Sequence, residues 1–144
     1  FNIDCDDEIE QIQNYLTIQK IRFHKNFEAL VEVEEAIYNH KILRLVLQPI
    51  VENAIIHGLE PKIGKGKLII KGYKDQENII FDILDDGIGM GNSKSKGEGI
   101  GMSNVMRRIQ IYYGEQYGII IPQYKGFTCV RIIIPTDRIE NKAM

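Results

Sequence analysis

Asp85-Asp86-Gly87-Ile88-Gly89 follows directly on the apolar run Ile79 to Leu84, and the fold of the chain is worked out most easily from this stretch. The apolar run is typical of a buried strand, so Asp85 is expected at its end, with the carboxylate at the floor of a pocket. Gly87 and Gly89 allow the chain to turn sharply beside a bound ligand because they have no side chain. The alternative is an ordinary Asp-Asp-Gly turn. Asp86 itself is expected to be a solvated or turn-stabilising neighbour of Asp85.

Upstream of this stretch, the sequence predicts a hairpin and a short helix. The run Lys67 to Tyr73 is a second strand pattern, and the polar connection 74–78 has hairpin length, so the two strands are expected to pair antiparallel. A helix of about two turns is predicted between Pro49 and Gly58, because proline suits the first helical turn and glycine the position just past the end. The i, i+4 spacing places Pro49, Asn53 and His57 on one face of this helix.

Downstream, the small and polar segment Gly91 to Lys96 is expected to be a mobile loop. Gly97-Glu98-Gly99-Ile100-Gly101 follows it and precedes a helix predicted over Met102 to Tyr112. Backbone N–H groups and the positive end of that helix could then face a polyphosphate. A dinucleotide-binding fold is the alternative for such a segment, but it requires the glycines directly after the first strand of a βαβ unit, whereas here a polar loop intervenes.

The outer parts of the chain complete a mixed architecture. Helical spacing predicts a helix over Asp7 to Phe23, with Asp7 and Glu10 resembling a capping box. Period-two alternation predicts a strand from Phe27 to Val33, and two further strands are expected at Gly118 to Ile121 and Phe127 to Ile134. Strands interspersed with a few helices favour an α/β (α+β) two-layer sandwich, a mixed sheet covered on one face by helices.

The composition narrows the function classes. A chain of 144 residues suits one domain, and its net charge of −2, with both signs spread along the sequence, favours contact neither with nucleic acid nor with a membrane. Cys5 and Cys129 are too few for a disulfide framework and are expected to be free thiols in a reducing cytosol. No apolar stretch approaches the ~20 residues needed to cross a bilayer. The chain begins without Met, and we read it as an isolated domain of a larger protein.

Taken in order, the segments around Asn53, Asp85 and Gly97 resemble the N, G1 and G2 boxes of the ATP-binding superfamily that includes DNA gyrase, the heat-shock ATPase chaperone, histidine kinases and mismatch-repair ATPases. The sequence is most similar to the LytS/YesM-like branch of sensor histidine kinases. That resemblance rests on Leu47 to Gly58 and on the run from Gly99 to Ile109 that ends near Tyr113-Gly114, and it extends from about Glu8 to Pro135. It implies a Bergerat-type ATP-binding fold with ATP and Mg²⁺ as cofactors, in which Gly91 to Lys96 is the ATP lid.

The resemblance also implies roles for individual residues. The amide oxygen of Asn53 would bind Mg²⁺, which prefers oxygen ligands, and Asp85 would accept a hydrogen bond from the adenine amino group, where guanine presents an acceptor. Glu52 either orients a metal-bound water or is a surface charge. The other residues expected at the nucleotide are His57, Gly87, Gly89, Lys94, Lys96, Gly97, Gly99, Gly101 and Met102.

For several of these residues a plain structural role is an equal alternative. Lys94 and Lys96 either neutralise phosphate charge or are ordinary solvated lysines, and His57 either contacts phosphate or stabilises the helix end. Arg107 and Arg108 could meet phosphate or the lid, but the apolar pattern of their helix favours structural ion pairing. Related kinases often place Lys at the position of Ile56, which leaves the phosphate contacts open.

The identity of residue 49 bears on which group accepts the phosphoryl group: water, serine or histidine. ATP-hydrolysing relatives and anti-sigma-factor serine kinases commonly carry a catalytic Glu four residues before the asparagine, and a proline cannot activate water or a serine hydroxyl. A histidine acceptor needs less help, because neutral imidazole is already nucleophilic near neutral pH. The resemblance therefore favours transfer to histidine over an ATPase or serine kinase. A non-catalytic nucleotide-binding or interaction module is a further alternative.

The acceptor itself is expected outside this sequence. His24, His40 and His57 lack the Asn-Pro-His-Phe context that this branch uses for its phosphoacceptor, and His24 and His40 are expected at the surface. The resemblance implies a histidine acceptor domain of the parent protein, a response regulator reached through it, and a homodimeric parent anchored in the bacterial inner or plasma membrane. Residues 1–24 would lead from the acceptor domain, and residues 25–144 would form the cytoplasmic catalytic domain.

Overall fold

The computed structural model describes residues 2–23, 27–88 and 97–136. In chain order the elements are β1 (Asn2–Asp4), α1 (Cys5–Phe23), β2 (Phe27–Val33), the 3₁₀ turn η1 (Glu35–Ile37), β3 (Lys41–Leu43), α2 (Gln48–Asn53), the π-helix η2 (Ala54–Leu59), β4 (Gly66–Asp75), β5 (Asn78–Asp85), α3 (Gly97–Tyr113), β6 (Gly118–Ile120) and β7 (Thr128–Pro135). Among these residues no helix is both long and apolar enough to cross a membrane.

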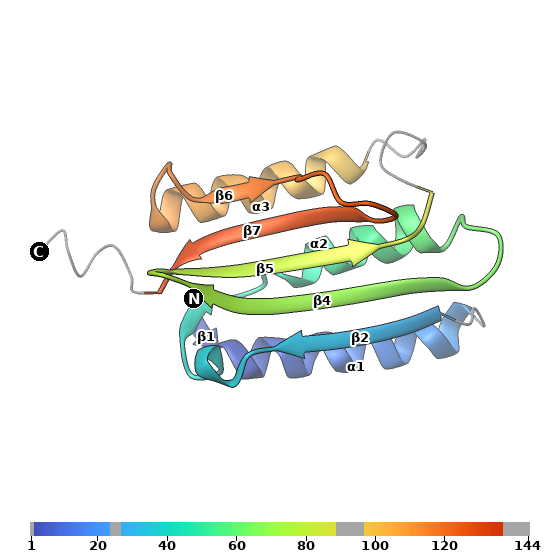
Figure 1. The fold of residues 1–144 in the computed structure, drawn as a ribbon, viewed down its shortest axis with the longest axis horizontal. Helices are drawn as coiled ribbons and strands as arrows, with labels where there is room; N and C mark the ends of the chain where they lie inside the picture. The colour runs from blue at the N-terminus through green and yellow to red at the C-terminus, as the bar shows by residue number, and fades with distance from the viewer. Residues whose placement is uncertain (1, 24–26, 89–96, 137–144) are drawn as a thin grey trace, which may run out of the picture.

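Five strands form the main sheet, in the order β2-β4-β5-β7-β6. Strand β2 pairs with β4 in parallel, and the remaining pairs, β4 with β5, β5 with β7 and β6 with β7, are antiparallel. Helices α1, α2 and α3 all lie on one side of this sheet (Figure 1). The predicted two-layer sandwich with a mixed sheet is therefore confirmed.

The core lies between the helices and the sheet. Ile12 of α1, Ile50 of α2 and Ile109 of α3 are buried and belong to the same apolar cluster as Phe81 of β5 and Ile132 of β7. Each helix therefore contributes an apolar face to one shared core, as amphipathic helices on a sheet must. Helix α1 belongs to this core, and its assignment to a separate segment 1–24 that leads from an acceptor domain stays a prediction.

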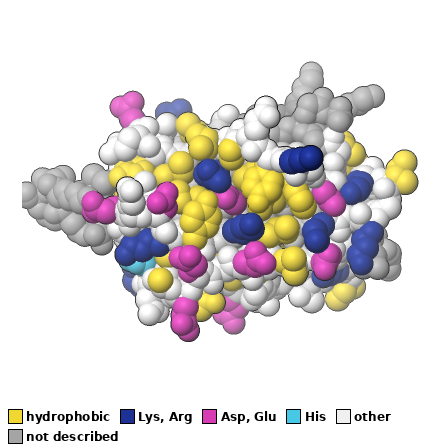
Figure 2. Space-filling view, viewed as in Figure 1, with side chains coloured by type: hydrophobic (Ala, Val, Ile, Leu, Met, Phe, Trp, Pro, Cys, Tyr) yellow, Lys and Arg dark blue, Asp and Glu magenta, His cyan; other side chains and the backbone are white. Residues whose placement is uncertain are grey.

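The other face of the sheet carries charged groups alternating in sign. The cross-strand register places Glu32, Lys71, Asp82 and Arg131 in one row over four strands. Figure 2 views the molecule from this side and shows basic and acidic side chains interspersed with apolar ones. Asp82 is only 3% exposed, and it accepts hydrogen bonds from Arg131 at 2.7 and 3.1 Å and from the hydroxyl of Tyr73 at 3.1 Å. This face is thus stabilised by paired charges without a covering helix.

The N-terminal segment differs from the prediction. Strands β1 and β3 form a small antiparallel sheet that the sequence pattern missed. Helix α1 begins at Cys5, so Asp7 lies inside the first turn and the predicted capping box is wrong. The reason is that backbone carbonyls replace the side-chain cap, since the N–H groups of Cys5 and Asp6 donate to the carbonyls of His40 and Tyr38 at 2.9 and 3.1 Å.

The other predicted strands are confirmed with small shifts. The hairpin between β4 and β5 is tighter than expected, because Asp75 already pairs with Asn78 and Gln76 adopts a left-handed φ of 58°. Strands β6 and β7 correspond to the two predicted closing strands. Cys5 and Cys129 are buried free thiols, as expected.

Candidate functional site

The helix that carries Asn53 changes its winding directly after that residue. Pro49 lies in the first turn of α2, as predicted, and Asn53 is the last α-helical residue. The chain then continues as the π-helix η2, in which the N–H of Glu60 donates to the carbonyl of Ile55 at 2.7 Å. Such widened turns occur frequently at functional sites. Pro49, Asn53 and His57 are all half-buried, and their predicted shared face stays a prediction.

Gly58 lies inside η2, so the prediction that it follows the helix end is wrong. Its role is close packing rather than capping. A Cβ atom at Gly58 would lie 2.6 Å from Oδ1 of Asp85, a distance that real Cβ contacts do not show. The absence of a side chain therefore allows the helix to lie directly against the end of β5.

The turn after β5 is joined to this helix through its backbone. The N–H of Gly87 donates to Oδ1 of Asp85 at 2.9 Å, and the N–H of Ile88 donates to the carbonyl of Gly58 at 3.1 Å. A Cβ atom at Gly87 would lie 2.1 Å from that same carbonyl oxygen. Asp85, the last residue of β5, is only 5% exposed. Two glycines and one buried carboxylate thus bring the first two sequence segments together.

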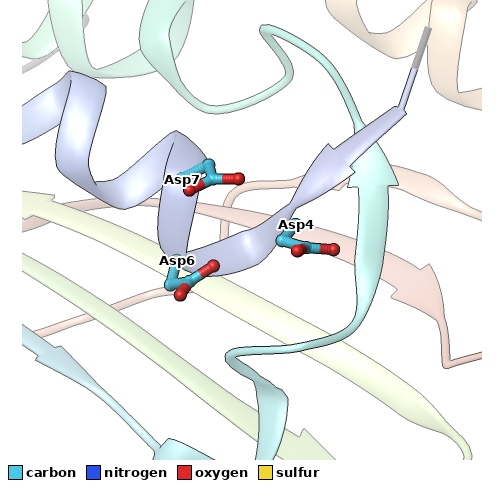
Figure 3. Close-up of side chains that lie close together, drawn as sticks. All are labelled: Asp4, Asp6 and Asp7. Carbon is cyan, nitrogen blue, oxygen red and sulfur yellow. The ribbon is translucent and has the colours of Figure 1, made fainter.

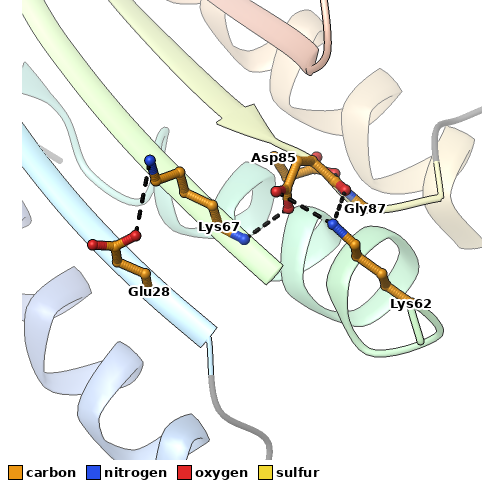
Figure 4. A network of polar contacts seen from close by, with 6 residues as sticks. Glu28, Lys62, Lys67, Asp85 and Gly87 are labelled. Atoms are coloured by element: carbon orange, nitrogen blue, oxygen red, sulfur yellow. Dashed lines mark hydrogen bonds and ion pairs between the residues drawn. The ribbon is translucent and has the colours of Figure 1, made fainter. Parts of the chain in front are cut away.

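Asp86 stabilises the same turn, as one of the two sequence readings expected. Its carboxylate accepts the N–H of Lys67 at 2.7 Å, and its own N–H donates to the carbonyl of Lys67 at 3.2 Å. Lys62 donates to the carbonyl of Asp86 at 2.8 Å and lies 3.3 Å from its carboxylate (Figure 4). Sequence reasoning missed Lys62, because nothing in the local pattern indicates that the segment after η2 folds back onto this turn.

The neighbours of Asn53 on its helix have structural contacts. Glu52 is half-buried, and its carboxylate accepts a hydrogen bond from the side chain of Gln48 at 3.1 Å. This contact supports the structural alternative for Glu52. Ile56, at the position where related kinases often have Lys, is 43% exposed.

Helix α3 begins at Gly97, five residues earlier than predicted. Gly97, Gly99 and Gly101 therefore lie within its first turns instead of preceding it. Each glycine costs a helix about 1 kcal/mol relative to Ala, so helix propensity alone does not favour this early start. The N–H groups without helical partners are then those of the glycine segment itself.

Of the remaining predicted site residues, some are described by the structure and others are not. Met102 is half-buried on α3. Gly89, Lys94 and Lys96, together with the predicted lid 91–96, lie outside the described residues. Arg108 donates to the backbone carbonyls of Arg44 and Leu45, so its pairing is structural, as the sequence favoured, although its partners are carbonyls rather than an acidic side chain.

A separate acidic group lies at the junction of β1 and α1, where Asp4, Asp6 and Asp7 are close together (Figure 3). Asp6 and Asp7 belong to the first turn of α1, where negative charge interacts favourably with the helix dipole. Asp4 forms an ion pair with Lys41 at 2.8 Å. Local electrostatics therefore account for this group.

The fold has close counterparts among solved structures. The catalytic domain of histidine kinase ThkA matches with a TM-score of 0.74 at 16% identity, over 94% of this chain and 97% of that structure. Histidine kinase AdeS of Acinetobacter baumannii matches with a TM-score of 0.65 over 95% of this chain and 67% of that structure. At these identities the likeness establishes the fold.

Sequence comparison finds relatives at higher identity than the solved structures. Sensor histidine kinase BtsS of Escherichia coli K12 is 30% identical over 130 residues, and sensor histidine kinase YesM of Bacillus subtilis is 31% identical over 133 residues. Each alignment covers 90% of this chain but only 23% of the relative, so the chain spans about a quarter of the length of these proteins. YesM and proteins named LytS are among the relatives, which confirms the resemblance to that branch.

A family model described as histidine kinase-, DNA gyrase B- and HSP90-like ATPase matches residues 38–138. The matched region contains the Asn53 helix, the Asp85 turn and the glycine-rich start of α3, and it covers most of the chain. The chain therefore belongs to the histidine kinase-, DNA gyrase B- and HSP90-like ATPase family.

Proposed function

We propose that this chain is the catalytic, ATP-binding domain of a two-component sensor histidine kinase, and that it holds Mg-ATP for transfer of the γ-phosphoryl group to a histidine outside this sequence. The observation that carries the proposal is the contact of Gly58 with the Asp85-Gly87 turn. This contact places a buried carboxylate beside the helix that bears Asn53. The similarity to BtsS and YesM, both named sensor histidine kinases, supports the same reaction class.

In this proposal Asp85 accepts a hydrogen bond from the adenine amino group, and its bond to the N–H of Gly87 holds the carboxylate in place. A buried, oriented acceptor discriminates strongly against a base that presents an acceptor at the same point. Gly89 would leave room for the purine, whereas Gly87 would serve the site by packing against Gly58 and by holding the Asp85 carboxylate through its N–H. The first N–H groups of α3, in the segment Gly97 to Gly101, face the phosphates, with Lys94, Lys96, His57 and Met102 around the nucleotide.

Mg²⁺ fits the residues present. Asn53 is half-buried at the junction of α2 and η2, and a neutral amide oxygen is a suitable ligand for a cation that also binds phosphate oxygens. When bound, Mg²⁺ would neutralise charge on the transferred phosphoryl group. Glu52 would orient a metal-bound water. Positioning by these groups supplies the catalysis, so no nucleophile from this chain is required.

The partners follow from the same proposal. The chain alone would not phosphorylate itself, because none of its three histidines has the sequence context of an acceptor. The acceptor would lie in another domain of a homodimeric parent, and a response regulator would receive the phosphoryl group from it. The domain would work in the cytoplasm beneath a membrane-anchored sensor, since the relatives are sensor proteins.

Calorimetric titration of ATP and GTP, with and without Mg²⁺, tests the proposal. We expect wild-type chain to bind ATP selectively, Asp85→Asn to lose most ATP affinity, and Asn53→Ala to keep metal-free ATP binding while losing the gain from Mg²⁺. Addition of the parent's acceptor domain should then give an acid-labile phosphohistidine. Equal affinity for GTP in the wild type, or steady phosphate release without an acceptor, would contradict the proposal.

A further inference from the structure

The backbone that leads into α2 is held by a buried carboxylate from another helix. Glu8 of α1 is only 1% exposed, and its two carboxylate oxygens accept the N–H groups of Leu45 and Leu47 at 3.0 Å each. Leu45 adopts a left-handed φ of 59°, which costs free energy for a residue with a branched side chain. A bidentate bond from a charged group is strong enough to hold such a conformation.

Helix α3 holds the same loop, Arg44–Leu47, through its backbone carbonyls. Arg108 donates to the carbonyl oxygens of Leu45 and Arg44 at 2.9 and 2.5 Å. Leu45 is therefore bound through its N–H by α1 and through its carbonyl by α3. Since Leu47 is the N-cap residue of α2, these bonds determine where that helix begins.

The far end of the same helical segment is held independently. There, the carbonyl of Gly58 accepts the N–H of Ile88, and the helix lies against Asp85. Asn53 lies between these two attachments, at the change from α- to π-winding. Loosening the Glu8 attachment would therefore shift Asn53 while the end beside Asp85 stays in place.

We propose that Glu8 and Arg108 are positioning residues for the metal and phosphate part of the nucleotide site, acting through the loop Arg44–Leu47 and helix α2 on Asn53. The inference rests on the proposed function and deepens it by identifying the contacts through which the N-terminal segment influences nucleotide binding. Neither side chain needs to touch ATP for this effect.

The N-terminal segment is well connected to the loop for such a role. Strand β1 pairs with β3, the N–H groups of Cys5 and Asp6 bond to the carbonyls of His40 and Tyr38, and Glu8 bonds to Leu45 and Leu47. All these contacts fall on residues 38–47, which lead directly into α2. A displacement of α1 relative to the sheet therefore shifts Asn53 more than it shifts Asp85, where the adenine is proposed to bind.

The test measures the dissociation constant of ATP for this chain in saturating Mg²⁺ and in EDTA, and takes the ratio as the contribution of the metal. Variants are Glu8→Gln, which can accept only one of the two N–H groups, and Arg108→Met, which keeps the aliphatic stem. We expect the Mg²⁺-dependent gain to fall about fivefold or more in each variant, as for a typical coupling between sites, with metal-free affinity changed by less than about twofold.

Arg131→Met is the matched control, because it removes an equally bidentate pair on the opposite face of the sheet. A fall of the ratio in this control equal to that in Arg108→Met would overturn the inference, since general destabilisation would then explain the effect. An unchanged ratio in folded Glu8→Gln and Arg108→Met would also overturn it. Arg108 is half-buried and bonds to the loop near the surface, so its variant decides the question if Glu8→Gln does not fold.

Nucleotide binding by the wild-type chain distinguishes failure of the positioning role from failure of the proposed function. Mg²⁺-dependent ATP binding by the wild type together with unaffected variants would refute only the positioning role. Absence of nucleotide binding by the folded wild type would refute the proposed function, and the positioning role with it.

Discussion

Gly58→Ala is expected to damage the nucleotide site and the fold together. The added methyl group would lie 2.6 Å from Oδ1 of Asp85, so either the helix or the carboxylate must move. If the carboxylate moves, it loses the N–H of Gly87, now at 2.9 Å. In an ordinary helix the same substitution would be stabilising, which makes the direction of the effect a sharp test.

The magnitude follows from three terms. Overpacking a tight contact costs about 1–3 kcal/mol, and a lost hydrogen bond to a charged group costs about 1.5–3 kcal/mol. Ala recovers up to about 1 kcal/mol through its better helix propensity. The net loss of unfolding free energy is about 1.5–5 kcal/mol, which for a domain of this length lowers Tm by about 5–17 °C.

Thermal unfolding and calorimetric ATP titration measure both consequences. We expect ATP affinity to fall about tenfold or more, because a displaced Asp85 no longer meets the adenine amino group. Ile63→Ala is the control, since the side chain of Ile63 is 98% exposed and its truncation should change stability by no more than about 0.5 kcal/mol. An unchanged or raised Tm with unchanged ATP affinity in Gly58→Ala would refute the close contact and the assignment of Asp85 built on it.

Two further predictions concern regions away from the nucleotide. Arg131→Met removes two hydrogen bonds to the buried Asp82 carboxylate, so the free energy of unfolding in urea should fall by about 1–3 kcal/mol. The loss is smaller than for a fully buried pair because Arg131 is partly exposed. The ATP dissociation constant should stay constant, and a changed ATP affinity would contradict this separation. Burial raises the pKa of the Cys129 thiol from 9.0 to about 11 and that of Cys5 to about 12, with nearby acidic groups adding to the effect. Because the thiol pKa is higher in the folded state, the contribution of the neutral buried thiols to the free energy of unfolding is complete below pH 9 and is lost as the pH rises from 9 towards 12. Urea unfolding between pH 8 and 10.5 should show this decline. Rapid labelling of the thiols in the native protein at pH 8 would contradict it.

Local patterns predicted most of the elements because their causes are local. The alternation in Phe27–Val33 and the apolar run before Asp85 reflect faces of a sheet, and both became strands of the main sheet. The hairpin between β4 and β5 and the position of Pro49 also depend on neighbouring residues alone. Those predictions are confirmed.

Predictions failed where a distant part of the chain supplied the partner. The start of α1 is capped by carbonyls of residues 38 and 40, and strand β1 pairs with β3 some forty residues away. The contacts of Lys62 and Glu8 likewise depend on long-range packing that spacing does not reveal.

By itself the sequence determined the fold class, the strands of the main sheet and the three segments that mark the family, because hydrophobic period and glycine placement are properties of the local chain. Only the tertiary structure decided that Gly58 is a packing contact inside a π-helix, that Lys62 folds back onto the Asp85 turn, and that Glu8 and Arg108 hold the entry to the Asn53 helix. The physical reason is that each of these roles is a hydrogen bond or a close approach between segments far apart in the sequence, and such contacts exist only once the helices have packed on the sheet.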